Sequence, residues 1–273
     1  MNKLVKQAPI YKYLKKNKFK NLPAYLEKEL DESNVKLVSD SKTGLIYSIA
    51  RESDIGKKII GVDFKCDTEL KKNEVKKIIE KVKSFDRRIK NSHFYVDYGG
   101  NLHHALEKCG AKNIGNVLYA KVSDGIKAVS NIENANYKIK RPTEEDIEEL
   151  VNLEYLAHRA SLTSRVGHIS KKMVRQLYQN MIKRKAYYMI TSDGVIVGTV
   201  GIAENKIKLG FIMTVAVHPD YQGLGISKLL YKQAFSHWQK KGVQFYSGVS
   251  TTTEVLGFAK KLKRTPLKVY LEI

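Results

Sequence analysis

The chain has 273 residues, 42% of them hydrophobic and 28% charged, which predicts a soluble globular protein with one large domain or two of ordinary size. No apolar run approaches the roughly 18 residues of a membrane span. The two cysteines are too few for a disulfide framework and suit a reducing cytoplasm. The formal net charge of +21 is spread over both halves and comes mainly from lysine, so we interpret it as a solvated surface and expect no nucleic acid as the principal partner.

The N-terminal half is predicted to alternate strands and helices. Its basic start, residues 1–20, has no continuous apolar core and is not expected to be a signal peptide. The elements expected after it are strands at 35–39, 45–50 and 59–64, a helix at 73–90, a strand at 93–98, a helix at 102–109 and a strand at 117–122. A polar stretch without periodicity, residues 123–136, is predicted to be a linker.

The C-terminal half shows a second alternating pattern. A short strand at 137–140 precedes a helix that begins at Thr143, where Asp146 completes a pattern close to a capping box. A polar loop is expected over residues 160–169. The elements expected after it are a helix at 170–184, a hairpin of strands 186–191 and 195–203 with its turn at 192–194, a strand at 206–217, a helix at 228–241 ended by Gly242, a strand at 243–250, a helix at 252–263 and a strand at 267–273.

The most informative segment joins an apolar strand to a helix through a glycine-rich turn. Residues 211–217 are almost entirely apolar, and the turn that follows contains Gly223 and Gly225. Glycine lets the backbone turn tightly and leaves room for a ligand beside the main chain. Because the turn opens a helix, several N–H groups and the positive end of the helix dipole would face one point, which suits a pyrophosphate. The alternative is a turn that merely requires small residues, since short glycine motifs also occur by chance.

The residues around this turn resemble the acetyl-CoA signature of the GNAT (Gcn5-related) N-acetyltransferases, Q/R-x-x-G-x-G/A after a strand that ends V-x-P. The six signature positions are filled by Gln222-Gly223-Leu224-Gly225-Ile226-Ser227, and Val217-His218-Pro219 precedes them. Serine stands where the family has glycine or alanine, but it is small enough to keep the approach open. A dinucleotide-binding fold would need a third glycine and a later acidic residue, and a P-loop would need Gly-Lys-Ser/Thr.

The resemblance covers residues 135–273 and implies the GNAT fold there, a mixed and mainly antiparallel sheet flanked by helices. It also implies that main-chain groups around Val215 and Val217 hold the pantetheine arm of acetyl-CoA like an added strand, and that one N–H polarises the thioester carbonyl. The N–H groups from Gly223 to Lys228 would bind the pyrophosphate. The cofactor-binding residues implied are Val215, Val217, Gln222, Gly223, Leu224, Gly225, Ile226, Ser227 and Lys228. No metal is expected.

Few acid–base groups are available to the expected site. Many family members carry a glutamate on the strand before the phosphate loop, but residues 206–217 contain no carboxylate. Glu204, just upstream, is a candidate base, with an exposed turn residue as the alternative. Ser250 is a candidate hydrogen-bond donor to the CoA sulfur, with N-capping as the alternative. Tyr246 is a further candidate, with packing in the sheet as the alternative.

A basic stretch at 158–175 would cover the acceptor side of the site. Its charged and titratable members beyond His158 are Arg159, Arg165, His168, Lys171, Lys172 and Arg175. A solvated helix face is one interpretation, and recognition of a carboxylate or phosphate on the acceptor is the other.

The N-terminal half resembles the tail of the second pattern, although any two α/β segments can be compared in this way. Residues 67–72 stand where the glycine loop would be, and Glu69 would repel a phosphate. We therefore expect residues 1–134 to form a degenerate GNAT-like α/β domain without the cofactor loop, and residues 135–273 to form the acetyl-CoA-binding GNAT domain.

The resemblance implies a cytoplasmic N-acetyltransferase, acting as a monomer or homodimer without a membrane partner. It would transfer the acetyl group of acetyl-CoA to a primary amine of a small molecule, such as an amino acid, or of a peptide, by direct attack. One alternative is a CoA-binding sensor or scaffold protein, which the few acid–base groups favour. Another is a tRNA-dependent transferase of the Fem type, against which the intact phosphate loop argues.

Overall fold

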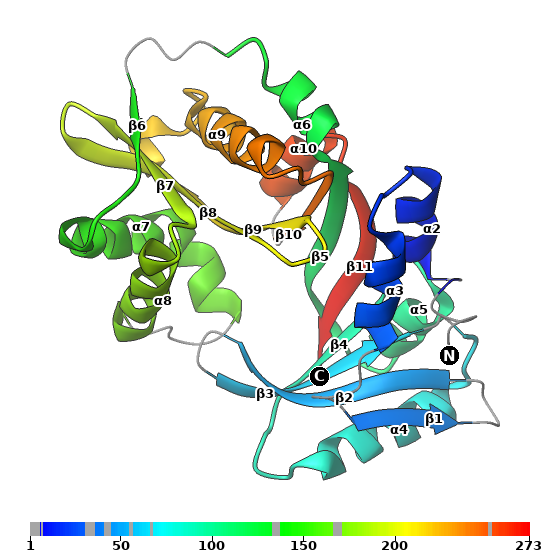
Figure 1. Ribbon diagram of the computed structural model, residues 1–273. Coiled ribbons are helices and arrows are strands. Elements are labelled where there is room, and N and C mark those ends of the chain that lie inside the picture. Colours follow the sequence, from blue (N-terminus) through cyan, green and yellow to red (C-terminus); the bar gives the residue numbers. More distant parts are fainter. Residues whose placement is uncertain are drawn as a thin grey trace. The chain divides into compact units, whose positions relative to one another are not determined.

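The computed structural model describes residues 6, 8–30, 36–40, 45–54, 57–65, 68–132, 137–165, 171–250 and 253–273. The contacts of the chain divide it into two compact units (Figure 1). Unit one comprises residues 1–118, 249–251 and 265–273, and unit two comprises residues 119–248 and 252–264. The fold is mixed α/β, with mostly antiparallel strands flanked by helices, as the sequence predicts.

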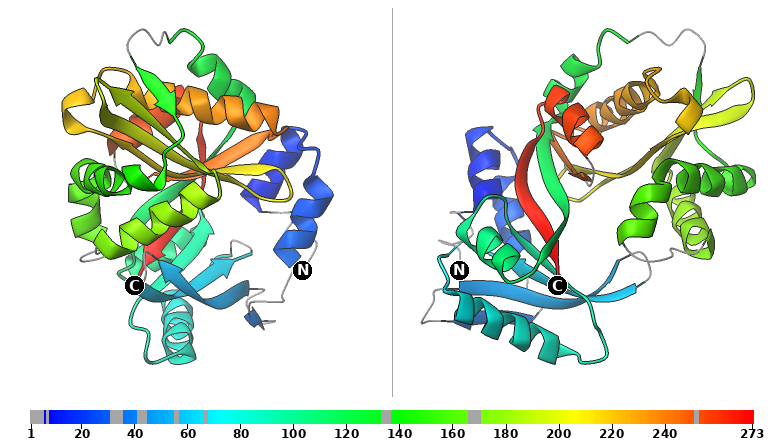
Figure 2. Two further views of the ribbon diagram at one scale, coloured as in Figure 1. Left: turned by 60° about the vertical axis from the view of Figure 1, so that its left-hand side comes forward. Right: turned by 180° about the vertical axis from the view of Figure 1, so that it is seen from behind.

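Unit one contains five complete strands in the order β1-β2-β3-β4-β11, followed by most of β5. Its strands are β1 (Lys36–Asp40), β2 (Leu45–Asp54), β3 (Lys57–Phe64), β4 (Ser92–Asp97), β11 (Thr265–Glu272) and β5 (Lys112–Lys121). Its helices are α2 (Pro9–Lys16), α3 (Leu22–Leu30), α4 (Lys72–Phe85) and α5 (Asn101–Lys108). β1 with β2, β2 with β3, and β4 with β11 pair antiparallel, whereas β3 pairs parallel with β4. Apolar side chains of α4 and α5 bury against these strands and form the core of the unit. Figure 2 shows α4, in cyan, running along one side of the blue strands.

Unit two has the strand order β5-β10-β9-β8-β7-β6. Its strands are the end of β5, β10 (Phe245–Ser250, to residue 248), β9 (Leu209–Val217), β8 (Val195–Glu204), β7 (Tyr187–Ser192) and β6 (Lys138–Lys140). Its helices are α6 (Val122–Ala128), η1 (Glu144–Asp146), α7 (Ile147–Arg165), α8 (Lys171–Lys183), η2 (Pro219–Tyr221), α9 (Ile226–Lys240) and α10 (Thr253–Lys261). β6 with β7, β7 with β8, and β8 with β9 pair antiparallel, whereas β9 pairs parallel with β10.

Two hydrophobic clusters fill unit two, one on each face of its strands. The cluster around Phe235 and Trp238 joins α9 and α6 to one face. The cluster around Leu150 and Tyr178 joins α7 and α8 to the other. Figure 1 shows α9 on one side of β7, β8 and β9, and α7 and α8 on the opposite side. The glycine loop and the acceptor-side helices therefore belong to one unit.

Local signals in unit two are confirmed. Thr143 N donates to the Asp146 carboxylate at 2.7 Å and opens the predicted helix. The turn between β7 and β8 places Asp193 and Gly194 at positive φ, which is the turn chemistry of a two-residue hairpin. Gly242 ends α9 with φ 70°.

The last strand lies in unit one, whereas most of the C-terminal half lies in unit two. Residues 267–273 are predicted to complete the C-terminal half, but β11 pairs antiparallel with β4, with Val269 opposite Val96. Val269 and Leu271 are fully buried in the core of unit one. The compact units therefore differ from the ranges 1–134 and 135–273, which stay a prediction about where the cofactor loop functions.

Two predicted loops are helical in part. Residues 123–136 are predicted to be a linker, but α6 occupies the start of this stretch and packs on α9. Gly125 makes that approach possible, because a Cβ there would lie 2.4 Å from the Phe235 ring. The predicted loop 160–169 overlaps α7, which runs to Arg165 because its alanine, leucine and arginine residues favour a helix even without an apolar stripe.

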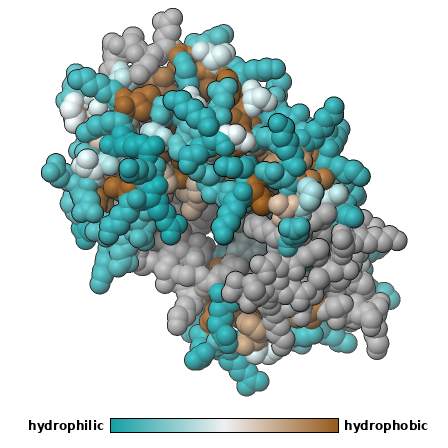
Figure 3. All heavy atoms as spheres, in the orientation of Figure 1, coloured by the Kyte–Doolittle hydropathy of each residue, from teal (hydrophilic) through white to brown (hydrophobic). Residues whose placement is uncertain are grey.

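The surface is largely polar. Hydrophilic side chains cover most of the described surface in the view of Figure 3. Among the described residues, no helix combines the length and the apolar character needed to cross a membrane.

Candidate active site

The two central strands of unit two separate halfway along their length. β9 pairs with β10 only over Leu209–Ile212, but it pairs with β8 along its whole length, as far as Val217 opposite Gly198. The His218 N–H donates to the Val197 carbonyl at 2.9 Å. Because successive N–H groups of a strand alternate in direction, those of Val215 and Val217 point away from β8, toward the side where the pairing with β10 has stopped.

A β-bulge marks the point of separation. The register passes from Thr214 opposite Gly201 to Ile212 opposite Ile202, so Met213 is an additional residue on β9. A bulge bends its strand and interrupts the local ladder. Its position coincides with the end of the β9–β10 pairing, beyond which the edge of β9 leads into the glycine loop.

Both glycines of the loop adopt the left-handed conformation. Gly223 has φ 82°, and Gly225, the N-cap of α9, has φ 85°. A Cβ at either position would meet no atom within 4 Å. Glycine is required there by the backbone angle, which costs other L-residues about 1–2 kcal/mol, and not by crowding within the protein.

The loop gathers N–H groups at the start of α9. Within the part of the chain that the structure describes, the N–H groups from Gly223 to Ser227 donate to no backbone carbonyl. The Lys228 N–H, in contrast, donates to the Gly225 carbonyl at 3.0 Å. The first turn of α9 has no acidic residue. We call residues 223–227 the anion cradle, since their N–H groups and the helix dipole both favour a negative ligand.

The other cofactor positions differ in exposure. The Gln222 side chain is exposed and Leu224 is 59% exposed, whereas Ile226 is buried in the core and anchors the loop. Anchoring the start of α9 in this way fixes the direction of the cradle.

Glu204 is engaged in ion pairs at the end of β8. Lys241 Nζ lies 2.8 Å from one carboxylate oxygen and His237 Nε2 lies 3.5 Å from the other. Burial raises the pKa of Glu204, but Lys241 and His237 outweigh it and bring that pKa below its usual value. Glu204 also pairs with Gly210, before the strands separate. These contacts favour a structural role over that of a base.

Tyr246 and Ser250 are both buried. The Tyr246 ring packs 5.1 Å from Phe235 and 5.4 Å from Trp238, with the Arg264 guanidinium 5.7 Å from its centre. These contacts favour the packing interpretation of Tyr246. Ser250 is 1% exposed, and its contacts place it in unit one.

A buried carboxylate that the sequence analysis does not single out lies beside the bulge. Glu154 on α7 is 9% exposed and accepts hydrogen bonds from the Tyr178 hydroxyl at 2.5 Å and the Thr214 hydroxyl at 3.0 Å. Burial raises the pKa of Tyr178 well above its usual value, so this phenol stays a neutral donor. The available signal was a glutamate within an apolar helical stripe, four residues after Leu150 and three after Val151.

Two residues of the basic stretch at 158–175 form contacts with other side chains of unit two. Arg175 forms a bidentate ion pair with Glu148, at 2.6 and 2.8 Å. Lys171 donates to the Asn152 amide at 3.0 Å. These contacts favour a solvated helix face for both residues. The side chains of His158, Arg159, Arg165 and His168 lie outside the described residues.

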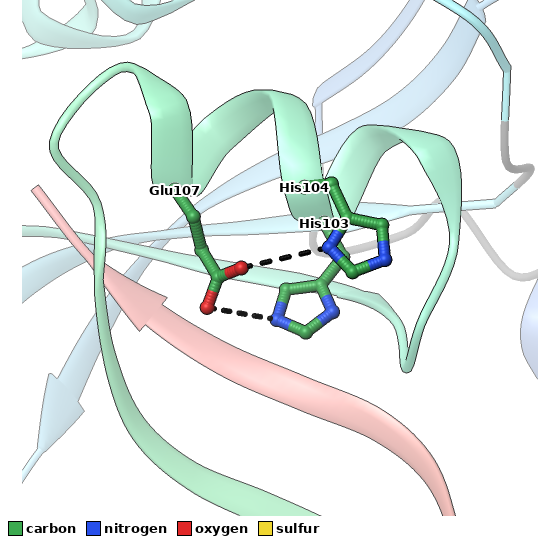
Figure 4. Close-up of side chains that lie close together, drawn as sticks. All are labelled: His103, His104 and Glu107. Atoms are coloured by element: carbon green, nitrogen blue, oxygen red, sulfur yellow. Dashed lines mark ion pairs between the residues drawn. The ribbon is translucent and has the colours of Figure 1, made fainter.

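One group of side chains in unit one has the spacing of metal ligands. On α5, the Glu107 carboxylate lies 3.3 Å from His103 Nε2 and 3.7 Å from His104 Nδ1 (Figure 4). However, His103 Nδ1 accepts a hydrogen bond from the Gly99 N–H at 3.1 Å. A neutral imidazole that accepts at Nδ1 carries its proton on Nε2. That nitrogen therefore has no lone pair to offer a metal, and its 3.3 Å approach to Glu107 favours a polar contact over a metal site.

The partly buried His237 is expected to make folding sensitive to acid. Burial lowers its pKa, and the groups that face it are Tyr188, Glu204, Lys241 and Arg141. A histidine kept neutral in the folded state gives its full stability above its unfolded pKa of about 6.5, and loses it as the pH falls below that value. We expect the free energy of unfolding, measured with urea, to fall between about pH 7 and 5, and to fall less in His237→Gln. An identical decline in both proteins would contradict this assignment.

Comparison with known proteins agrees with this geometry. Residues 146–262 match the model of the acetyltransferase (GNAT) family. Similar structures are a GCN5-related N-acetyltransferase from Sphaerobacter thermophilus (14% identity, 91% of this chain and 85% of that one, TM-score 0.60) and one from Kribbella flavida (13%, 88% and 89%, 0.55). A tandem GNAT protein from the clavulanic acid biosynthesis pathway is also similar (12%, 84% and 78%, 0.51). No curated protein matches in sequence. The cradle, the separated strands and the family match all fall within 146–262, and this chain therefore carries an acetyltransferase domain of the GNAT family.

Proposed function

We propose that unit two transfers the acetyl group of acetyl-CoA to a primary amine of a small molecule, such as an amino acid, or of a peptide. The observation that carries the proposal is the anion cradle at the start of α9, immediately after the edge of β9 beyond its pairing with β10. The cradle N–H groups would bind the pyrophosphate, and the edge of β9 would hold the pantetheine arm through main-chain hydrogen bonds.

The reaction needs a neutral amine close to a polarised carbonyl. Direct attack forms the new C–N bond at the thioester carbon and breaks its C–S bond, releasing CoA. The N–H groups of residues 215 and 217 point toward the side of β9 where the thioester would lie, and such a donor stabilises the charge that develops on the carbonyl oxygen. Holding both reactants in one place lowers the entropic part of the barrier.

We propose further that the first half is a degenerate GNAT-like unit without a cofactor site. β3 and β4 are parallel over four residue pairs, as β9 and β10 are. The helix after β3, however, is closed at its N-terminus, because the Glu74 carboxylate accepts from the Lys71 N–H at 2.7 Å. A carboxylate there occupies the place that a phosphate would take and repels it. Glu69 adds a second negative charge before this helix.

A CoA-binding sensor remains the second candidate. It is favoured by the positions of the three predicted acid–base residues: Glu204 is ion-paired, Tyr246 is packed among aromatic rings and Ser250 is buried.

The test is to mix the full-length protein with acetyl-CoA and a panel of amino acids, alkylamines and short peptides, and to follow thiol release. Calorimetry measures acetyl-CoA binding in parallel. Amine-dependent thiol release supports the acetyltransferase. Binding with no thiol release supports the sensor, and absence of acetyl-CoA binding contradicts both.

A further inference from the structure

We propose that Glu154 takes up the proton of the attacking amine through the hydroxyl of Thr214. The proposal rests on the proposed acetyl transfer in unit two. It supplies the proton acceptor that residues 206–217 do not contain. Glu154 lies on α7, which packs on the strand face opposite α9. It is therefore distant in sequence from β9, the strand on which a base is sought.

The contacts form a path from the strand edge to a buried carboxylate. Thr214 is partly exposed and follows Met213, the bulge residue, which is 56% exposed. Its hydroxyl lies 3.0 Å from Glu154 Oε1 and 3.3 Å from Oε2. A hydroxyl can accept one proton while it donates another. Thr214 can therefore connect an amine at the edge of β9 to a carboxylate that is itself only 9% exposed.

The surroundings hold both groups in position. Gly201, opposite Thr214 on β8, leaves room for it, because a Cβ there would lie 3.2 Å from the Thr214 methyl group. On the other side of the carboxylate, Tyr178 donates from α8. The ring of Tyr187 on β7 packs edge-on against the ring of Tyr178, with 5.0 Å between the ring centres. The Tyr187 hydroxyl donates a hydrogen bond to the Thr199 hydroxyl at 2.9 Å.

The two phenols near Glu154 are not proton acceptors. Burial raises the pKa of Tyr178 and of Tyr187, so both phenols keep their protons at neutral pH. Neither phenol competes with Glu154 as an acceptor. Thr214 is the hydroxyl of this group that lies on β9, next to the proposed thioester position.

The proton transfer balances as follows. An N–H bond of the ammonium breaks, its proton goes to Thr214 Oγ1, and the original hydroxyl proton goes to Glu154, which becomes a neutral carboxylic acid. The amine then uses its freed electron pair to attack the thioester carbon. The C–S bond breaks, and the departing thiolate takes one of the two protons left on the attacking nitrogen, while the amide product keeps the other. Glu154 finally returns its proton to water.

The experiment compares Glu154→Gln, Thr214→Val and Thr214→Ser in the full-length chain. Acetyl-CoA is the donor, and the acceptor is the most active amine of the panel, or water where hydrolysis is the only reaction seen. We expect Glu154→Gln and Thr214→Val to lower kcat by about 100-fold or more, in the range of general base catalysis. Thr214→Ser keeps the hydroxyl and is expected to retain far more activity than Thr214→Val. The acetyl-CoA Kd should stay within about threefold in all three, since the cradle is untouched.

The pH profile separates this role from a purely structural one. Wild-type kcat/KM should fall on the acid side as the carboxylate is protonated. In Glu154→Gln the fall of kcat/KM that comes from protonation of the carboxylate should be absent. The remaining pH dependence should be that of the substrate, with a rate that rises as more of the amine is in the free form. Tyr178→Phe removes the hydrogen bond from Tyr178 to the carboxylate but leaves the path through Thr214, so we expect a smaller loss than in Thr214→Val.

The outcomes are distinct. Activity and a pH profile unchanged by Glu154→Gln would overturn the inference and leave the proposed function standing. Equal losses in Thr214→Ser and Thr214→Val would also overturn it, because the hydroxyl would then be irrelevant. Wild-type protein that releases no thiol from acetyl-CoA would contradict the proposed acetyl transfer itself, and this inference with it.

Discussion

Gly225→Glu is expected to abolish measurable acetyl-CoA binding while leaving the chain folded. Two unit charges about 4 Å apart near a protein surface repel by about 4 kcal/mol, and the new carboxylate would stand beside the pyrophosphate. A loss of affinity of at least about 100-fold, on the order of 3 kcal/mol, is therefore expected. Calorimetric titration of the variant with acetyl-CoA measures it. The side chain itself has room, because no atom lies within 4 Å of a Cβ at this position.

Two variants serve as controls for this result. Gly225→Ala introduces the same backbone strain, about 1–2 kcal/mol, without the charge, and should lower the melting temperature more than the affinity. Glu69→Gly removes a negative charge from the corresponding loop of the first half and should change neither binding nor activity. Affinity retained in a folded Gly225→Glu protein would show that the anion cradle is not the cofactor site.

The parts of the site that sequence reasoning predicts are those governed by short-range rules. A strand of apolar residues, two glycines and an amphipathic stretch are sufficient to predict the β9–loop–α9 unit. The positive φ angles of Gly223 and Gly225 agree with that prediction. The turn at Asp193 and the cap at Gly242 follow from the same kind of local chemistry.

The missing parts depend on contacts between distant segments. Alternating Leu267, Val269 and Leu271 predict a strand, but alternation does not specify which neighbour it pairs with, and the neighbour is β4. α6 has few apolar residues, and its packing on α9 depends on the space left at Gly125. Glu154 lies 60 positions before Thr214, and only the fold brings the two together.

The two halves differ in how the helix after the first parallel strand begins. In unit two, α9 begins with glycines and leaves its first N–H groups available for a ligand. In unit one, α4 is preceded by its N-cap Lys71, whose N–H donates to the chain's own Glu74 carboxylate. A helix N-terminus attracts negative charge in either case. At α4 the protein supplies this charge itself, through Glu74, whereas at α9 it does not. This difference distinguishes the proposed cofactor site from the start of α4.

Gly210→Val, at the single glycine of β9, is expected to lower the free energy of unfolding. A Cβ at this position would lie 2.7 Å from the indole ring of Trp238, which is fully buried. α9 can approach the strand so closely only because Gly210 has no side chain. Overpacking of a buried contact costs about 1–3 kcal/mol, and sometimes more. Trp238 is the only tryptophan of the chain, so urea unfolding followed by its fluorescence reports directly on the site.

Gly257→Ala is the matched control for this experiment. Gly257 lies within α10, is exposed, and has open space where a Cβ would be. Alanine is preferred over glycine inside a helix by about 0.5–1 kcal/mol, so this variant should be as stable as the wild type or more so. A Gly210→Val protein with wild-type stability and an unchanged Trp238 emission would contradict the close packing of α9 on β9. Since the start of the same helix forms the anion cradle, a displaced α9 in Gly210→Val should weaken acetyl-CoA binding as well, even though residue 210 does not belong to the cradle.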